Sequence, residues 1–133
     1  MALPRKKFRE LIFQLLHSVD STATEAEKVS FFQHLLKTTN KNIKDAMNYT
    51  NLILDKKRFI DEKITKISIS YDFNRITSVE LTILRLSIFE ILFDENICKK
   101  IIISEAIRLS KKFANHQSFS YINAILDNNE IFS

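Results

Sequence analysis

Glycine is absent from the 133 residues of this sequence, and proline occurs once, as Pro4. Tight hairpin turns usually need glycine, because its backbone adopts positive φ without steric cost. The sequence therefore predicts an all-α fold in place of a β-rich one. Its length fits one domain over residues 1–133, which can bury an apolar core without disulfides or metals.

Helix ends often contain a residue in the left-handed conformation, and asparagine tolerates this conformation best after glycine. Asn40, Asn96 and Asn115 lie where the apolar periodicity of the chain breaks. Since no glycine is present, we expect these three asparagines to mark helix ends.

Apolar residues repeat with helical spacing along most of the chain. The pattern predicts a first helix from about Pro4, a second after a capping box of Thr24 and Glu27, a third capped by Asn40, and a short fourth. Residues 67–73 alternate with period two, but no partner strand of similar quality exists elsewhere. We interpret them as a helix end followed by a loop.

A second capping box, Thr77 with Glu80, begins the most apolar segment of the chain. Residues 79–93 are apolar almost all round, which predicts a central buried helix. Arg85 lies inside this segment and needs a partner in the fold, because a buried charge is costly when unpaired. Two further helices follow, the last capped by Ser118, which gives about seven helices in all.

The sequence contains no recognisable pattern of catalytic residues. His17, His34 and His116 are scattered, and with the single Cys98 they form no spacing typical of a zinc site. A phosphate-binding glycine loop is impossible without glycine. We therefore expect no enzyme, no metal and no cofactor, and the absence of a secretory or membrane-spanning segment predicts a cytoplasmic protein.

Basic residues gather at the start of the first helix, within an overall formal charge of +4. Arg5, Lys6 and Arg9 are predicted to lie on or beside the face opposite the apolar stripe, with Phe13 among them. Basic side chains that neutralise phosphates, and an aromatic ring that stacks on a base, suit single-stranded RNA. A solvated charged face with Phe13 packed against another helix explains the same pattern equally well.

Residues 84–113, LRLSIFEILFDENICKKIIISEAIRLSKKF, resemble the NusB family pattern of Leu-Arg, an aromatic-Glu-Leu-like step and an EAI-x-L-x-K helix. Residues 121–127 are similar to the family's F-V-N-G-V-L-D signature, with Ala124 in place of the glycine. The opening RKKFRELIFQLLHS is similar to the family's arginine-rich start, whereas residues 19–70 match only in helical texture. The resemblance implies a compact, single-domain bundle and a transcription antitermination factor.

The same resemblance implies partners and site residues. It implies binding to boxA RNA of ribosomal RNA leaders, together with the ribosomal protein NusE, in an RNA polymerase antitermination complex. The implied RNA-binding residues are Arg5, Lys6, Lys7, Arg9, His17 and Tyr121. Glu80 is the implied contact for the protein partner, although the capping box explains this residue by itself, and Tyr121 fits a core aromatic as well. Pairing of two copies as a homodimer is left open.

Two other classes of function compete with this one. A helical adaptor would use the basic face to dock an acidic protein and would never contact RNA. An RNA-modifying enzyme would carry a similar helical module before a catalytic domain, for which a chain ending at Ser133 leaves no room. Binding to a short boxA-like RNA separates the antitermination factor from the adaptor.

Overall fold

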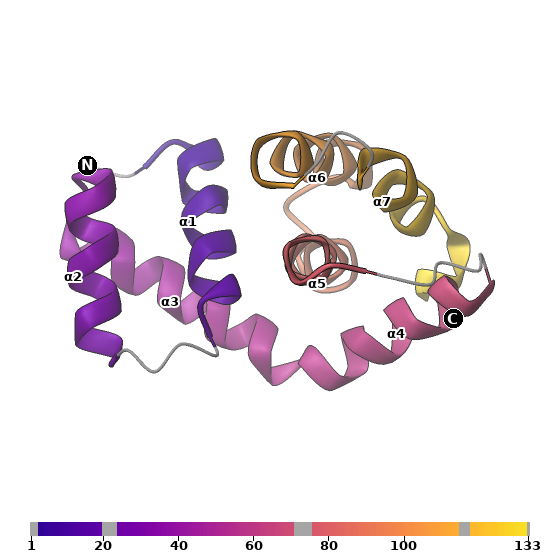
Figure 1. The fold of residues 1–133 in the computed structure, drawn as a ribbon, viewed down its shortest axis with the longest axis horizontal. Helices are drawn as coiled ribbons and strands as arrows, with labels where there is room; N and C mark the ends of the chain where they lie inside the picture. The colour runs from indigo at the N-terminus through magenta and orange to yellow at the C-terminus, as the bar shows by residue number, and fades with distance from the viewer. Residues whose placement is uncertain (1–2, 20–23, 71–75, 115–117, 133) are drawn as a thin grey trace. The chain divides into compact units, whose positions relative to one another are not determined.

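The computed structural model describes residues 3–19, 24–70, 76–114 and 118–132, and their regular structure is helical (Figure 1). The elements are α1 (Arg5–His17), α2 (Glu25–Leu36), α3 (Asn40–Asp55), α4 (Lys57–Ser70), α5 (Ser78–Phe93), α6 (Lys99–Phe113), α7 (Ser118–Leu126) and the 3-10 helix η1 (Asn129–Phe132). The predicted all-α fold is confirmed. The chain divides into two compact units, Met1–Leu54 and Asp55–Ser133, and each is described by itself.

The first unit contains α1, α2 and nearly all of α3. The apolar stripe predicted for α1 is buried, with Leu11 fully inaccessible. The ring of Phe8 contacts that of Tyr49 on α3 edge-on, with centroids 6.5 Å apart. On α3, Ile43 and Ile53 are fully buried, and the buried hydroxyl of Thr50 donates to the carbonyl one turn earlier. Apolar burial at helical spacing therefore stabilises this unit, as the sequence predicts.

The connection between α2 and α3 differs from the prediction. Lys37 follows α2 and takes the left-handed conformation, with φ of 50°. Asn40 is the first residue of α3, and the hydroxyl of Thr39 accepts the N–H of Asn42 at 3.3 Å, so a threonine supplies the cap. The assignment of Asn40 as a cap was wrong, because the helix begins one residue earlier than the pattern indicates.

Asn96 does not supply a left-handed residue either. Asn96 lies in the turn after α5, where its N–H donates to the Asp94 carboxylate at 3.1 Å. Among the described residues, Lys37 is the one with positive φ. Asn115 lies outside the described residues. In the part of the chain that the structure describes, one left-handed lysine and polar caps therefore take the place of glycine at helix ends.

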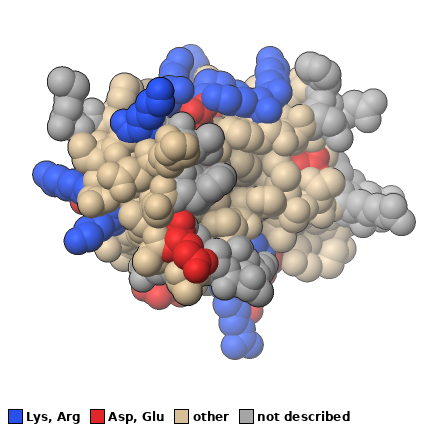
Figure 2. All heavy atoms as spheres, turned by 60° about the vertical axis from the view of Figure 1, so that its left-hand side comes forward, with Lys and Arg blue, Asp and Glu red and all other residues tan. Residues whose placement is uncertain are grey.

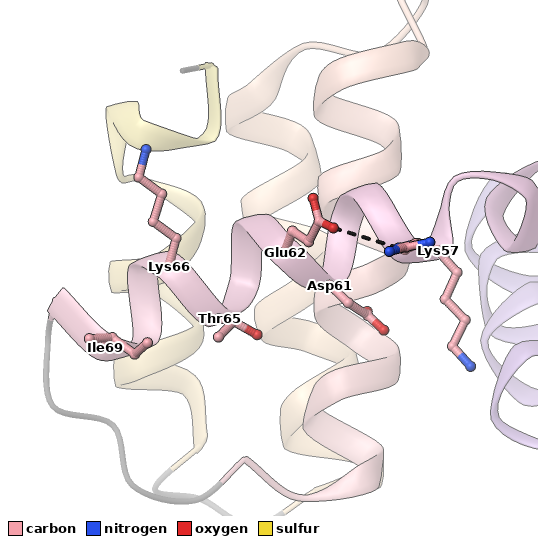
Figure 3. Close-up of a pocket in the computed structure, with 7 residues that line it drawn as sticks. Lys57, Asp61, Glu62, Thr65, Lys66 and Ile69 are labelled. Atoms are coloured by element: carbon pink, nitrogen blue, oxygen red, sulfur yellow. Dashed lines mark ion pairs between the residues drawn. The ribbon is translucent and has the colours of Figure 1, made fainter.

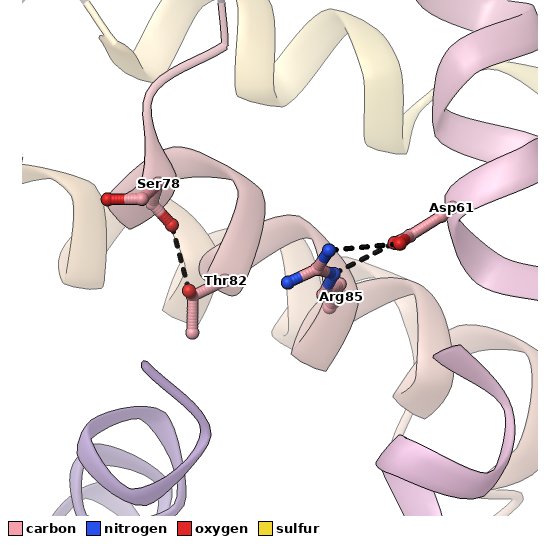
Figure 4. Close-up of polar contacts among 4 residues, drawn as sticks. All are labelled: Asp61, Ser78, Thr82 and Arg85. Carbon is pink, nitrogen blue, oxygen red and sulfur yellow. Dashed lines mark hydrogen bonds and ion pairs between the residues drawn. The ribbon is translucent and has the colours of Figure 1, made fainter. Parts of the chain in front are cut away.

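The second unit is organised around α5, which Figure 1 shows nearly end-on, with α4, α6 and α7 around it. Ile83, Leu84 and Ile88 are fully buried on it. The partner that Arg85 needs is Asp61 on α4, whose carboxylate accepts two hydrogen bonds of 2.8 and 2.9 Å from the guanidinium (Figure 4). The prediction of a central buried helix is confirmed.

The start of α5 is tied to α7. Thr77 and Glu80 form the predicted capping box, and the second oxygen of the buried Glu80 carboxylate accepts a hydrogen bond from the Ser118 hydroxyl. Ser118 is the first residue of α7, and its hydroxyl is donated to Glu80. A hydroxyl that donates can still accept a backbone N–H, so the capping of α7 by Ser118 stays a prediction. The capping box of α2, Thr24 with Glu27, is also present as predicted.

The segment with alternating apolar residues ends a helix, as expected. Residues 67–70 form the last turn of α4, and the remainder of 67–73 lies outside the described residues. Among the residues that the structure describes, no helix has both the length and the apolar character needed to cross a membrane.

Candidate nucleic-acid interface

Three cationic side chains are exposed in the first turn of α1. Arg5, Lys6 and Lys7 directly follow Pro4, and this turn contains no acidic residue. The free N–H groups and the dipole of a helix N-terminus also attract anions, so the cations and the backbone act in the same direction. On the face of the molecule in Figure 2, lysine and arginine side chains extend from the surface. This end of α1 is suited to phosphate.

A polar stripe continues from this turn along α1. Lys7, Glu10, Gln14 and His17 follow one another at helical spacing of three or four residues. The ammonium of Lys7 lies 4.0 Å from the Glu10 carboxylate, an ion pair that leaves the lysine side chain about half exposed at 58%. Glu10 is buried, but more than half of the Lys7 side chain is open to solvent and can also contact a phosphate.

Arg9 and Phe13 do not belong to the exposed face. Their exposed fractions are 7% and 3%, so the expectation that both project from the basic face was wrong. Arg9, Phe13 and Leu16 share one stripe of the helix at i, i+4 and i+7, and this stripe is buried together with the predicted apolar one. The alternative for Phe13, a packed aromatic, describes its position correctly.

His17 is the aromatic group that α1 exposes. It is the last residue of the helix, and its ring stacks on that of Phe13, with centroids 6.0 Å apart and an angle of 14° between the planes. The buried phenylalanine thus fixes the orientation of an exposed imidazole. A base stacking on His17 would meet a ring that is already held in place.

Tyr121 lies on α7 in the second unit and is half-buried. Near it in the sequence, the exposed Phe119 has the ammonium of Lys111 5.6 Å from its ring centroid. Tyr121 and α1 belong to different units, so a surface shared by the two remains a prediction. Sequence reasoning overlooked Lys111 and Phe119, although two lysines at the end of α6 and an aromatic residue at the start of α7 are visible in the sequence.

Glu80 has a structural role in this fold. Its side chain is 4% exposed, and its two oxygens accept hydrogen bonds from the Thr77 N–H and the Ser118 hydroxyl. A carboxylate that is buried and bonded in this way presents little of itself to a partner. The capping-box explanation is confirmed, and the partner contact remains an untested prediction that this burial disfavours.

Gln14 was missed as a candidate by sequence reasoning. Its side-chain oxygen is buried and has no hydrogen-bond partner among the described residues. An unsatisfied buried acceptor costs free energy, so this oxygen is an unusual feature of α1. Its place between Lys7 and His17 on the polar stripe is the signal that could have identified it.

The NusB family model matches residues 6–130 of this chain. The chain belongs to the NusB family. The transcription antitermination protein NusB of Chlamydia pneumoniae is 35% identical over 131 residues, covering 98% of this chain and 81% of the relative. The protein of the same description from Ligilactobacillus salivarius is 33% identical and covers 96% of this chain and 98% of the relative.

A solved structure of NusB from T. maritima has the same fold. It superposes with a TM-score of 0.76 at 26% identity and covers 99% of both chains. The resemblance predicted from residues 84–113, 121–127 and the basic opening is therefore confirmed, and so is the NusB-like helical fold. Membership of this family also supports the predicted function in transcription antitermination at the level of the family.

Proposed function

We propose that this chain acts in transcription antitermination by binding single-stranded RNA of the boxA type through α1, with NusE as its protein partner. Arg5, Lys6 and Lys7 contact phosphates, and His17 and Tyr121 contact bases. The observation that carries this proposal is the first turn of α1, with three exposed cations and no acidic residue, in a chain of the NusB family. Arg9 is left out of the contact set because it is buried.

The chemistry of the α1 residues supports RNA over a purely acidic protein partner. Cations at a helix N-terminus bind phosphates without reading sequence, whereas an exposed imidazole supplies a flat ring for an unpaired base. His17 and Arg5 lie at opposite ends of α1. They are 12 residues apart, which is about 18 Å along a helix. That length accommodates several nucleotides of an extended strand.

The test is a salt titration of RNA binding. If three cations contact phosphates, log affinity falls with log salt with a slope near −2, from about −0.7 per contact. Replacing Arg5 and Lys6 by glutamine should flatten the slope by about 1.4 and weaken binding. A boxA-type oligonucleotide and a scrambled one, each with and without NusE, separate sequence preference from general affinity for RNA.

The matched control removes the same charge elsewhere in the first unit. Lys41 and Lys44 are exposed on α3, and replacing both by glutamine should leave the slope nearly unchanged. Equal slopes in the two double variants, with both proteins folded, would contradict the assignment of the RNA surface to α1. Absence of RNA binding by the unmodified protein, with or without NusE, would favour the helical adaptor.

A further inference from the structure

A second surface of the molecule combines exposed aromatic rings with cations, far along the sequence from α1. Phe59 on α4 and Phe93 at the end of α5 are 46% and 41% exposed, and their ring centroids lie 6.2 Å apart at an angle of 60°. Contiguous exposed apolar side chains often mark a binding surface. Both rings line a hollow of about 440 Å³ within the second unit.

Lysine side chains flank both rings. The ammonium of Lys56 lies 5.3 Å from the centroid of Phe93, and that of Lys63 lies 5.2 Å from the centroid of Phe59. A nucleotide whose base stacks on either ring could therefore place its phosphate near a lysine ammonium. Residues 55–66 contain five basic and three acidic residues, a formal excess of two positive charges.

Two of the three acidic side chains of this segment, Asp61 and Glu62, form ion pairs with arginines. Asp61 is bound by Arg85 of α5. Glu62 lies 3.8 Å from Arg58 one turn earlier, and the two side chains are 69% and 97% exposed (Figure 3). Such an exposed pair is weak, so a phosphate can replace Glu62 at Arg58 with little loss. Asp55 and Glu62 also line the hollow, where carboxylates can accept hydrogen bonds from the exocyclic amines of a base.

The hollow continues into a second one along α4. This second hollow, of about 680 Å³, lies over the exposed side of the helix, and Arg58 and Glu62 line both. Figure 3 shows Lys57 and Lys66 near the two ends of this side of α4. Phosphates on either side of a bound base would therefore meet further cations along the same helix.

We propose that the hollow lined by Phe59 and Phe93 binds an unpaired nucleotide of single-stranded RNA. The base stacks on the exposed rings, and Lys56, Lys63 and Arg58 contact its phosphates. The inference rests on the proposed RNA binding, but it assigns a site in the second unit that does not include α1 or Tyr121. Aromatic rings beside cations favour nucleic acid over a protein partner, because every base presents a flat face and every nucleotide a phosphate.

The experiment replaces both rings by leucine, which keeps apolar bulk and removes the flat face. Phe59→Leu/Phe93→Leu should weaken binding of a short single-stranded RNA by at least five-fold, since stacking of one base corresponds to about 5- to 150-fold in affinity. The salt slope should stay unchanged, because no charge is removed. This behaviour differs from that of the α1 charge variant, in which the slope itself flattens.

The control is a third exposed phenylalanine that also has a lysine over its ring. Phe132 in η1 is 59% exposed, with the Lys99 ammonium 5.4 Å from its centroid, and it lies outside the hollow. Phe132→Leu should leave RNA affinity unchanged. Melting curves of both variants exclude unfolding as the cause of a loss.

Photocrosslinking of the unmodified protein to a thiouridine-containing RNA gives an independent measurement, with the crosslinked peptides identified by mass spectrometry. Crosslinks at Phe59 or Phe93 support the inference. Unchanged affinity in the leucine variant, with crosslinks confined to α1 and α7, would overturn the inference and leave the proposed function intact. If the unmodified protein binds no RNA, both fail, and a loss of self-association or of peptide binding in the leucine variant would assign the hollow to a protein.

Discussion

The two capping boxes of this protein have the same chemistry in very different surroundings. In α2, Thr24 and Glu27 exchange hydrogen bonds of 3.2 and 3.1 Å while both are exposed. In α5, Thr77 and Glu80 exchange bonds of 3.2 and 2.8 Å, but Glu80 is buried and also accepts a hydrogen bond from Ser118. The first box begins a helix, and the second also attaches that helix to α7.

The comparison shows that a sequence motif fixes a local geometry without fixing its energetic weight. An exposed cap competes with water for the same hydrogen bonds, so its net contribution is small. A buried carboxylate with two donors has no water to replace them, and its removal leaves those donors unsatisfied. The two boxes should therefore respond very differently to the same substitution.

The largest effect tests whether α5 is the buried helix that this comparison requires. Replacing Leu84 or Ile88 by alanine should lower the free energy of unfolding by about 2–5 kcal/mol, because both side chains are fully inaccessible and truncation leaves a cavity. Denaturant unfolding measures the change. Losses below about 0.5 kcal/mol for both variants would be typical of surface positions and would remove the contrast between the two helices.

The next effect compares the two glutamates directly. Glu80→Ala should cost about 2–4 kcal/mol, because it removes two hydrogen bonds to a buried carboxylate, whereas Glu27→Ala should cost about 0.5 kcal/mol. Glu27 serves as the control, since it has the same role in an exposed box. Losses of equal size in unfolding experiments would show that burial does not distinguish the boxes.

A smaller loss of stability is expected from removing the hydrogen bond between Ser118 and Glu80, which has no counterpart in the exposed box. Ser118→Ala should lower stability by about 1.5–2 kcal/mol, because its buried hydroxyl donates to a charged group. In a double-mutant cycle with Glu80→Ala, the double variant should lose less stability than the sum of the two single losses, as for residues in direct contact. Additive losses would contradict the contact. The exposed Ser104 on α6 offers a neutral serine-to-alanine control.

The smallest effect concerns the threonine of the exposed box. Thr24→Ala should cost about 0.5–1 kcal/mol, the low end for an N-cap, since water replaces the lost acceptor. Thr77→Ala should cost more, because it also disturbs the buried carboxylate. Unfolding curves of the two variants under the same conditions make the comparison, and a larger loss for Thr24 would reverse it.

Features that depend on local spacing were predictable from the sequence. Both capping boxes were predictable, because a threonine and a glutamate three residues apart exchange side-chain to backbone hydrogen bonds within one turn. The buried character of α5 followed from its apolar residues on every side, and the need of Arg85 for a partner followed from its position there. The identity of that partner, Asp61, required the fold, since 24 residues separate the two.

Features that depend on packing were not predictable in the same way. Arg9 and Phe13 lie at the edge of the apolar stripe of α1, and only the neighbouring elements decide whether such an edge is covered. Ser118 was predicted only as a cap, whereas its hydrogen bond to a buried carboxylate on another helix depends on the fold. The candidate site therefore kept Arg5, Lys6, Lys7 and His17 as exposed groups and lost Arg9 and Phe13.

The lysine that ends α2 shows what a glycine-free chain gains and gives up. Every residue with a Cβ samples fewer backbone conformations when unfolded, so this chain loses less backbone entropy on folding than one that contains glycines. The conformational cost is concentrated at Lys37, where a left-handed backbone is about 1–2 kcal/mol unfavourable. Lys37→Gly would relieve that cost, because glycine adopts the left-handed conformation freely. Position 37 is thus the natural starting point for raising the melting temperature.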